Sequence, residues 1–286
     1  MVVTIPRHDF PTDDLAEGLA VLRESLSWAI EDLEEVPRAV QDAFSVSLTL
    51  AESSCALDPQ VSEIATWDAW VTAMQSGSAL FAAALETEGT VQCRIEQKLW
   101  AIPASGPAYY TDAGNWITAF FLAVICREKD RMTTLCRVPI SLLRQSGADY
   151  DEYIYAWIDA LQSYWLRRPG VGDKLVAAVA GTSPETARAA DPELMLKILY
   201  PPLDLFFRYL RQDHEQFNSA LTDALRWHRE YWTADEERTT NPDGYVALGP
   251  LAMACFAHDA GFPINVESEY LPRHLLLGSR LGEGQT

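Results

Sequence analysis

Residues 213–234, with the sequence DHEQFNSALTDALRWHREYWTA, decide the fold class of this chain. Apolar and aromatic side chains recur there at intervals of three and four residues: Phe217, Ala220, Leu221, Ala224, Leu225, His228, Tyr231 and Trp232. This spacing places them along one side of an α-helix, and polar residues fill the other side. The stretch therefore predicts a long helix lying on a core, with Asp213 at its start.

Further helices are predicted along most of the chain. Residues 60–88 and 150–168 carry apolar side chains on more than one side, which is typical of central helices. A capping side chain precedes a proline at Asp58-Pro59, Ser183-Pro184 and Asp191-Pro192, so we expect a helix to begin at each. The segment Thr12-Asp13-Asp14 and the capping-box pair Asp149 and Glu152 predict two more helix starts.

Only residues 91–102 alternate apolar and polar side chains, which predicts a short β-hairpin or an extended connection. The Pro/Gly-rich stretch 103–107 follows, and we expect a seam between an acidic N-terminal helical layer, 1–102, and a helical-hairpin stack, 103–286. Tyr200-Pro201-Pro202 predicts a kink or a break in a helix. Polar corners at Asp130, Asp213 and Asp259 favour an all-α fold of stacked antiparallel hairpins, either a divergent α-solenoid or a tetratricopeptide-like stack, with at most one short β-hairpin.

The charge of the chain disfavours nucleic acid as a partner. Lys and Arg number 22 against 41 Asp and Glu, a formal charge of −19 over 286 residues. Phosphate binding needs a basic surface. Residues 1–60 alone hold twelve acids and three bases, so the N-terminal part would attract a cationic partner.

The same sequence contains no apolar run of membrane-spanning length and no apolar stretch near Met1 that would act as an export signal, so we expect a cytoplasmic protein. The five cysteines, Cys55, Cys93, Cys126, Cys136 and Cys255, are well separated and are interpreted as buried reduced thiols.

Catalytic and metal-binding signatures are missing from the sequence. There is no GxSxG, no Gly-rich phosphate loop, no Glu-x-x-His pair and no HExxH. Asp13-Asp14-Leu15-Ala16-Glu17 resembles an aspartate-rich magnesium motif of all-α terpenoid synthases, but acids at a helix start explain it better. We interpret His228 as a packed core histidine, and Asp112, Asn115 and Trp116 as a helix start. We therefore expect neither an enzyme nor a bound metal or cofactor.

Acidic clusters are the candidate binding residues. The run 31–35 lies at the end of the first predicted long helix, where negative charge opposes the helix dipole. An aromatic residue among carboxylates near 267–270 would serve as an anchor. The candidates for partner binding are Asp13, Asp14, Glu17, Glu31, Asp32, Glu34, Glu35, Asp235, Glu236, Glu267, Glu269 and Tyr270.

Several motifs occur in order between residues 112 and 272: Asp112-Ala113-Gly114-Asn115-Trp116, Leu199-Tyr200-Pro201-Pro202, His228 with Tyr231-Trp232, Ala247-Leu248-Gly249-Pro250-Leu251-Ala252, Gly261-Phe262-Pro263-Ile264 and Glu267-Ser268-Glu269-Tyr270-Leu271-Pro272. With them the chain resembles the immunity protein 49 family of bacterial polymorphic toxin systems, and the resemblance extends over about residues 10–277.

The resemblance implies a helical protein that binds a cognate toxin and blocks it, and with the charge it implies a partner with a basic surface. Two alternatives stay open. One is a scaffolding or regulatory helical-repeat protein that binds a peptide or protein in a Tyr/Trp-lined groove. The other is an all-α enzyme with an unrecognised site.

Overall fold

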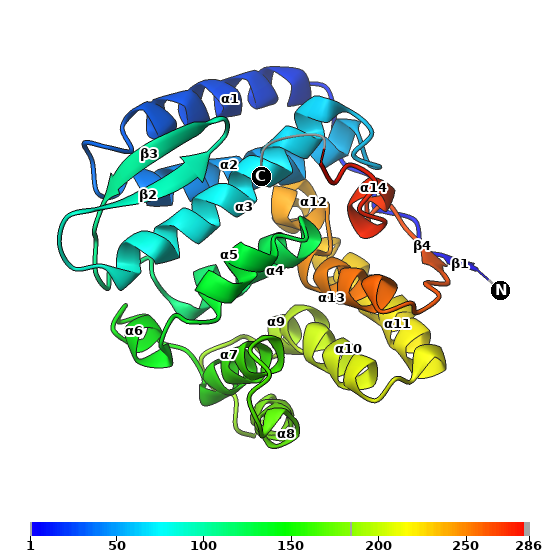
Figure 1. The fold of residues 1–286 in the computed structure, drawn as a ribbon. Helices are drawn as coiled ribbons and strands as arrows, with labels where there is room; N and C mark the ends of the chain where they lie inside the picture. The colour runs from blue at the N-terminus through cyan, green and yellow to red at the C-terminus, as the bar shows by residue number, and fades with distance from the viewer. Residues whose placement is uncertain (1, 184, 283–286) are drawn as a thin grey trace. The chain divides into compact units, whose positions relative to one another are not determined.

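The computed structural model describes residues 2–183 and 185–282 and is mostly helical (Figure 1). The helices of the first half are α1 (Leu15–Glu31), α2 (Ala39–Leu57), α3 (Ile64–Leu85), α4 (Ala113–Ile125), α5 (Lys129–Leu135) and α6 (Ile140–Arg144). Those of the second half are α7 (Glu152–Trp165), α8 (Val171–Gly181), α9 (Pro192–Leu194), α10 (Pro201–Leu210), α11 (His214–Trp232), α12 (Glu236–Thr240), α13 (Leu248–Asp259) and α14 (Arg273–Leu276). The all-α prediction is confirmed, whereas the solenoid-like stacking stays a prediction.

Two short sheets accompany the helices in the described residues. Strands β2 (Thr90–Ile95) and β3 (Lys98–Pro103) form the antiparallel hairpin that the alternation at 91–102 predicts. Strands β1 (Val3–Thr4) and β4 (Val266–Glu267) form a second, parallel pair. This second pair is not a hairpin, so the expectation of at most one hairpin agrees with the described residues, although nothing in the sequence indicated the parallel pair. Two-residue strands are too short for a period-two pattern to mark them.

The chain divides into two compact units, and each is described separately below. The N-terminal unit is Pro11–Ala148 together with the segment from Gly278 onward. The C-terminal unit is Asp149–Leu277 together with the first ten residues. The seam expected after residue 102 falls inside the N-terminal unit.

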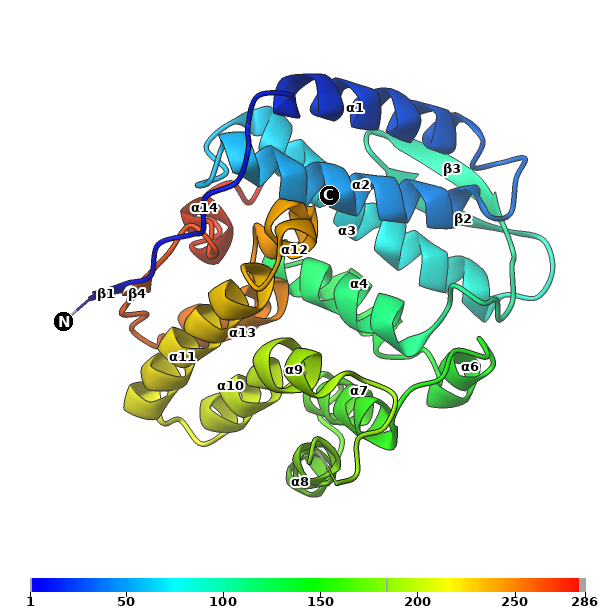
Figure 2. The same ribbon diagram turned by 180° about the vertical axis from the view of Figure 1, so that it is seen from behind.

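Helix α3 is the centre of the N-terminal unit and packs against α2, α4 and the hairpin. Trp67, Trp70 and Phe81 on it are almost fully buried, as the two-sided apolar pattern predicts. Gly77 lets α2 approach closely, because a Cβ there would lie 2.7 Å from Cε2 of Phe44. Helix α1 packs on α2, on the side of α2 away from α3 (Figure 2).

Some helices begin at residues other than those predicted from the sequence. Helix α3 begins at Ile64 and not at Pro59, although the Asp58 carboxylate accepts the backbone N–H groups of Ser62 and Glu63 just before it. The N-cap of α7 is Asp151, not Asp149. The start at Asp191-Pro192 is confirmed, because the Asp191 side chain accepts two N–H groups of α9. The helix expected at Ser183-Pro184 involves Pro184, which lies outside the described residues.

In the C-terminal unit, α11 occupies the stretch that opened the sequence argument, and the Asp213 side chain accepts the N–H of Gln216 at its start. The chain before Pro201 departs from α-helical geometry as a π-helical turn, Met195–Leu199. The N–H of Tyr200 there donates to the carbonyl of Met195. Proline has no N–H and crowds the preceding turn, so the irregularity predicted at Tyr200-Pro201-Pro202 is confirmed.

Candidate functional site

Helix α1 presents two different faces. Leu19, Leu26 and Ile30 are buried, and they follow each other at helical spacing on the side that packs against α2. On the opposite side, residues spaced by four and three positions form one exposed row, which we call the outer stripe: Glu17, Val21, Glu24, Trp28 and Glu31. The helix therefore has a second, exposed row that combines acidic and apolar side chains.

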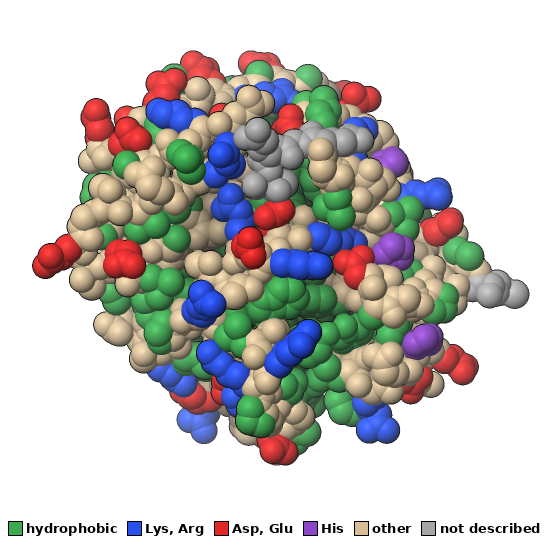
Figure 3. Space-filling model, in the orientation of Figure 1, with side chains coloured by type: hydrophobic (Ala, Val, Ile, Leu, Met, Phe, Trp, Pro, Cys, Tyr) green, Lys and Arg blue, Asp and Glu red, His purple; other side chains and the backbone are tan. Residues whose placement is uncertain are grey.

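The apolar members of the outer stripe are unusually exposed. Trp28 retains 60% of its accessible surface and Val21 retains 57%. Acidic and hydrophobic side chains alternate along the upper rim of the surface, where α1 lies in the same orientation (Figure 3). Tryptophan is normally buried over most of its surface, so an exposed tryptophan on a helix is a candidate contact residue.

Carboxylates just beyond the two ends of α1 extend this surface. Asp13 and Asp14 lie before α1, and Asp32 and Glu35 lie after it; all four are exposed. Within the part of the chain that the structure describes, no Lys or Arg is in ion-pair distance of these four or of Glu17, Glu24 and Glu31. Their charge is therefore directed at solvent rather than neutralised by the protein.

Glu34 differs from its neighbours because it is engaged with the fold. Its Oε1 accepts the backbone N–H of Ala101 at 3.0 Å. Ala101 belongs to β3, and this N–H points away from the β2 partner strand. An unpaired strand edge is a site of unwanted pairing, and a carboxylate that accepts from it protects that edge. Glu34 thus holds the hairpin beside the α1–α2 corner.

The position of the acids runs against local stability. The last turn of α1 contains no basic residue, and Glu31, Asp32, Glu34 and Glu35 gather at this end. The C-terminus of a helix carries partial negative charge, so each exposed carboxylate there costs on the order of 0.3–1 kcal/mol. A cluster that opposes local stability is expected where function requires it.

In each of the two acidic clusters of the C-terminal unit, one carboxylate is engaged inside that unit and one is exposed. The Asp235 side chain accepts the N–H of Arg238 as the N-cap of α12 and lies 3.2 Å from the Arg238 guanidinium. Glu236 is exposed beside it. Glu269 pairs with Arg7 at 3.6 Å, and Glu267 is exposed on β4.

Tyr270 is fully buried, so it does not lie at the surface as the anchor that the sequence suggested. Its hydroxyl oxygen is 2.8 Å from Nδ1 of His8 and accepts the backbone N–H of His8 at 3.1 Å. Nε2 of His8 is 3.2 Å from the carbonyl of Thr239, which can only accept. Burial lowers the pKa of His8 and raises the pKa of Tyr270 to about 12, so both are neutral at pH 7. This network fixes the N-terminal segment in the C-terminal unit.

His228 is a packed core histidine, as its position on the α11 stripe suggested. Its Nε2 lies 3.0 Å from the Gly244 carbonyl, and its ring meets that of Tyr270 edge-on at 4.8 Å. Burial lowers its pKa to about 4, so it is uncharged at neutral pH.

The motif at 112–116 is likewise structural. Asp112 accepts the N–H of Asn115 as the N-cap of α4, and Trp116 donates from Nε1 to the Leu135 carbonyl at 2.9 Å.

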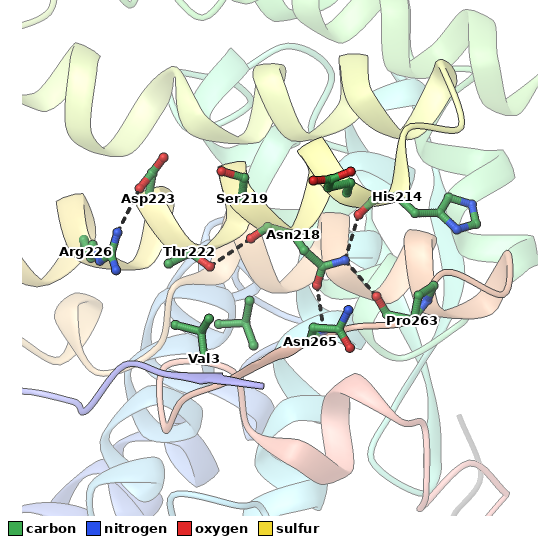
Figure 4. A pocket seen from close by; sticks show the side chains of 11 residues that line it. Val3, His214, Asn218, Ser219, Thr222, Asp223, Arg226, Pro263 and Asn265 are labelled. Carbon is green, nitrogen blue, oxygen red and sulfur yellow. Dashed lines mark hydrogen bonds and ion pairs between the residues drawn. The ribbon is translucent and has the colours of Figure 1, made fainter. Parts of the chain in front are cut away.

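An open groove of about 500 Å³ runs along α11 in the C-terminal unit (Figure 4). Asn218 crosses one end of it: its Nδ2 donates to the carbonyls of His214 and Pro263, and its Oδ1 accepts the N–H of Asn265. Asp223 and Arg226 pair along the wall at 3.2 Å. Polar side chains line most of the groove, and among the described residues no three His, Cys, Asp or Glu gather in a way that could hold a metal ion.

The structure defines a mostly helical protein whose helix α1 carries an exposed row of acidic and apolar side chains. The chain belongs to the immunity protein 49 family, whose model matches residues 58–275. No curated protein and no solved structure matched the chain. None of the described helices has the length and apolar character needed to cross a membrane.

The family match separates two sets of residues. The motifs that carry the resemblance, from Asp112 to Pro272, lie inside the matched region, and those described above make contacts within the fold. The matched region begins after α1 and α2, so the acidic residues up to Glu35 lie outside it.

Sequence reasoning missed Trp28 and Val21 as candidate contact residues. The available signal was a pair of apolar residues, seven positions apart, in an otherwise acidic row at helical spacing.

Proposed function

We propose that this chain is an immunity protein that binds a cognate toxin protein in the cytoplasm and neutralises it through the acidic face of the N-terminal unit. Membership of the immunity protein 49 family is the observation that carries this proposal. Immunity proteins in general act by binding rather than by catalysis, which agrees with a surface of solvent-directed carboxylates.

The charge indicates the chemistry of the partner. A formal charge of −19 repels anionic partners and attracts a basic protein surface, such as that of a toxin domain that acts on nucleic acid. Complementary charge mainly raises the association rate, which then falls as salt screens the interaction. The acids before, within and after α1 form the main proposed contact set, and Asp235, Glu236, Glu267 and Glu269 form secondary patches.

The test is co-expression with the product of the adjoining gene, with and without this chain. Protection of growth together with a purified complex would support the proposal. If that product arrests growth equally in the presence of this chain and forms no complex with it, the proposal fails.

Charge reversal tests the surface separately from the function. Replacing Glu31, Asp32 and Glu35 by Lys should slow association and weaken its salt dependence. Unchanged association would show that the assigned surface is wrong while toxin binding itself stands. Glu34 is better left in place, because its hydrogen bond to Ala101 makes any effect ambiguous.

The alternative is a scaffolding or regulatory protein that binds a peptide. The groove along α11 is the observation that favours it. However, Asn218, Ser219 and Thr222 line this groove rather than Tyr or Trp side chains, so it lacks the aromatic contacts expected of a peptide-binding groove. Binding of unstructured basic peptides with no effect of charge reversal on α1 would favour this alternative.

A further inference from the structure

The outer stripe of α1 is a helix face with no partner in the N-terminal unit. Trp28 lies in the last turn of α1, with Glu24 one turn before it and Glu31 nearly one turn after it. Residues three and four apart on a helix are neighbours on its surface. The indole is therefore bordered along the helix by carboxylates, and Val21 adds a second apolar contact two turns away.

This arrangement has the layout of a protein interface on a small scale. Tryptophan is enriched among the residues that dominate binding energy, and such residues are surrounded by polar contacts that exclude water. Arg23 is the one basic residue in the helix, and it lies outside the stripe. The apolar centre and the acidic border thus occur on the same face.

The negative charge of the carboxylates beside Trp28 determines which kind of partner can bind this face. A second copy of the chain would set carboxylates against carboxylates, and anionic lipid or nucleic acid would be repelled in the same way. A basic protein surface is attracted, and its Lys or Arg side chains can pair with the unneutralised carboxylates while an apolar pocket receives the indole.

We propose that Trp28 is the anchor residue of the toxin interface: it inserts into an apolar pocket on the partner protein, and Lys or Arg side chains at the rim of that pocket contact Glu24 and Glu31. This inference rests on the proposed function and names the site through which it operates. It places the centre of recognition on α1, outside the region that matches the family.

The experiment measures the dissociation constant of the purified complex with the adjoining gene's toxin for the full-length chain and its variants. Trp28→Ala should weaken binding at least about 30-fold, and Trp28→Phe should recover part of the loss. The matched control is Trp227→Ala, because Trp227 is 37% exposed on α11 of the C-terminal unit, and it should change binding less than about 3-fold.

The role of the carboxylates beside Trp28 is tested by reversing their charge and, as a control, that of an acid elsewhere on the surface. Glu24→Lys and Glu31→Lys should each lower the association rate, whereas Glu88→Lys, an exposed acid in the loop before the hairpin, should leave it nearly unchanged. Circular dichroism of each variant checks that the fold is intact, which the exposure of these side chains leads us to expect.

Three results would overturn the inference. The first is tight binding by Trp28→Ala alongside a normal complex of the wild-type chain. The second is an equal loss with Trp28→Ala and Trp227→Ala. The third is a wild-type dimer in sedimentation that Trp28→Ala dissociates, since this would make a second copy the occupant. If the wild-type chain forms no complex and gives no protection, the proposed function itself fails, and that outcome differs from all three.

Discussion

Acid should destabilise the C-terminal unit through His228. Its side chain is buried and its pKa is lowered from 6.5 to about 4, chiefly by burial. Below pH 6.5 the unfolded chain takes up a proton at this residue, while the folded chain stays neutral until about pH 4. The stability that His228 contributes is therefore fully present above pH 6.5 and is lost as the pH falls towards 4. Between about pH 7.5 and 5.5, the two pKa values correspond to a loss of about 1 kcal/mol of unfolding free energy.

The test variant is His228→Gln, whose side-chain amide can still donate to the Gly244 carbonyl but does not titrate. It should be less stable than the wild type at pH 7.5, because the ring contacts with Tyr270 and Trp232 are lost. Its free energy of unfolding should, however, fall by about 1 kcal/mol less than that of the wild type between those pH values. Urea unfolding followed by circular dichroism measures both quantities.

A matched variant, His258→Gln, removes a partly exposed histidine from the neighbouring helix α13. It should leave the wild-type pH dependence nearly intact. Equal pH dependence of the wild type and His228→Gln would refute the reasoning, because the carboxylates common to both proteins would then account for all of the acid sensitivity.

Three further predictions concern packing and accessibility. Gly77→Ala should destabilise the N-terminal unit by about 1–3 kcal/mol in urea unfolding, because the added Cβ would lie 2.7 Å from the buried Phe44 ring. A stabilised variant would show that α2 and α3 can move apart without loss of packing. Asp151→Ala should lower the free energy of unfolding by about 1–2 kcal/mol, because the carboxylate accepts hydrogen bonds from the backbone N–H groups of Arg188, Ala189 and Ala190. Hydrogen exchange at these three amides should become faster, and unchanged exchange there would contradict this role of Asp151. All five cysteines should resist alkylation by iodoacetamide at pH 8 until the chain unfolds, because each is buried and burial raises the pKa of Cys93 to about 11. Mass spectrometry measures the labelling, and rapid labelling of the native chain would contradict this prediction.

The helices could be predicted because their signals are local. The apolar stripe of 213–234 and the side chain of Asp213 define α11 without reference to the rest of the chain. The hairpin at 91–102 was predictable for the same reason, since six residues in each strand repeat the period-two pattern.

Contacts between distant residues were not predictable in this way. The parallel pair of Val3–Thr4 with Val266–Glu267 joins segments more than 250 residues apart, and nothing in either dipeptide specifies the other. Tyr270 reads as an exposed aromatic among acids, but its hydroxyl bonds to His8 from the opposite end of the chain. Asp58-Pro59 predicts a helix start, yet the carboxylate caps the chain several residues later.

The candidate surface was only partly predictable, because charge is visible in a sequence whereas exposure depends on packing. The acids of α1 were identifiable from composition, but Glu34 proved to be bonded to the hairpin and Trp28 proved to be exposed. A tryptophan in an amphipathic helix is ordinarily assigned to the core. The row of residues 17, 21, 24, 28 and 31 shows otherwise only when the opposite face, with Leu26 and Ile30, is seen to be packed on α2.

Two independent observations support the proposal that α1 recognises the partner. The region shared with the family begins at residue 58, and the motifs within it make structural contacts, as Trp116 does with Leu135 and Asn218 does with Pro263. Helix α1 precedes that region, and its last turn carries acids where the helix dipole favours bases. A segment outside the shared scaffold that keeps locally unfavourable charge beside an exposed tryptophan is best explained by a partner that complements both.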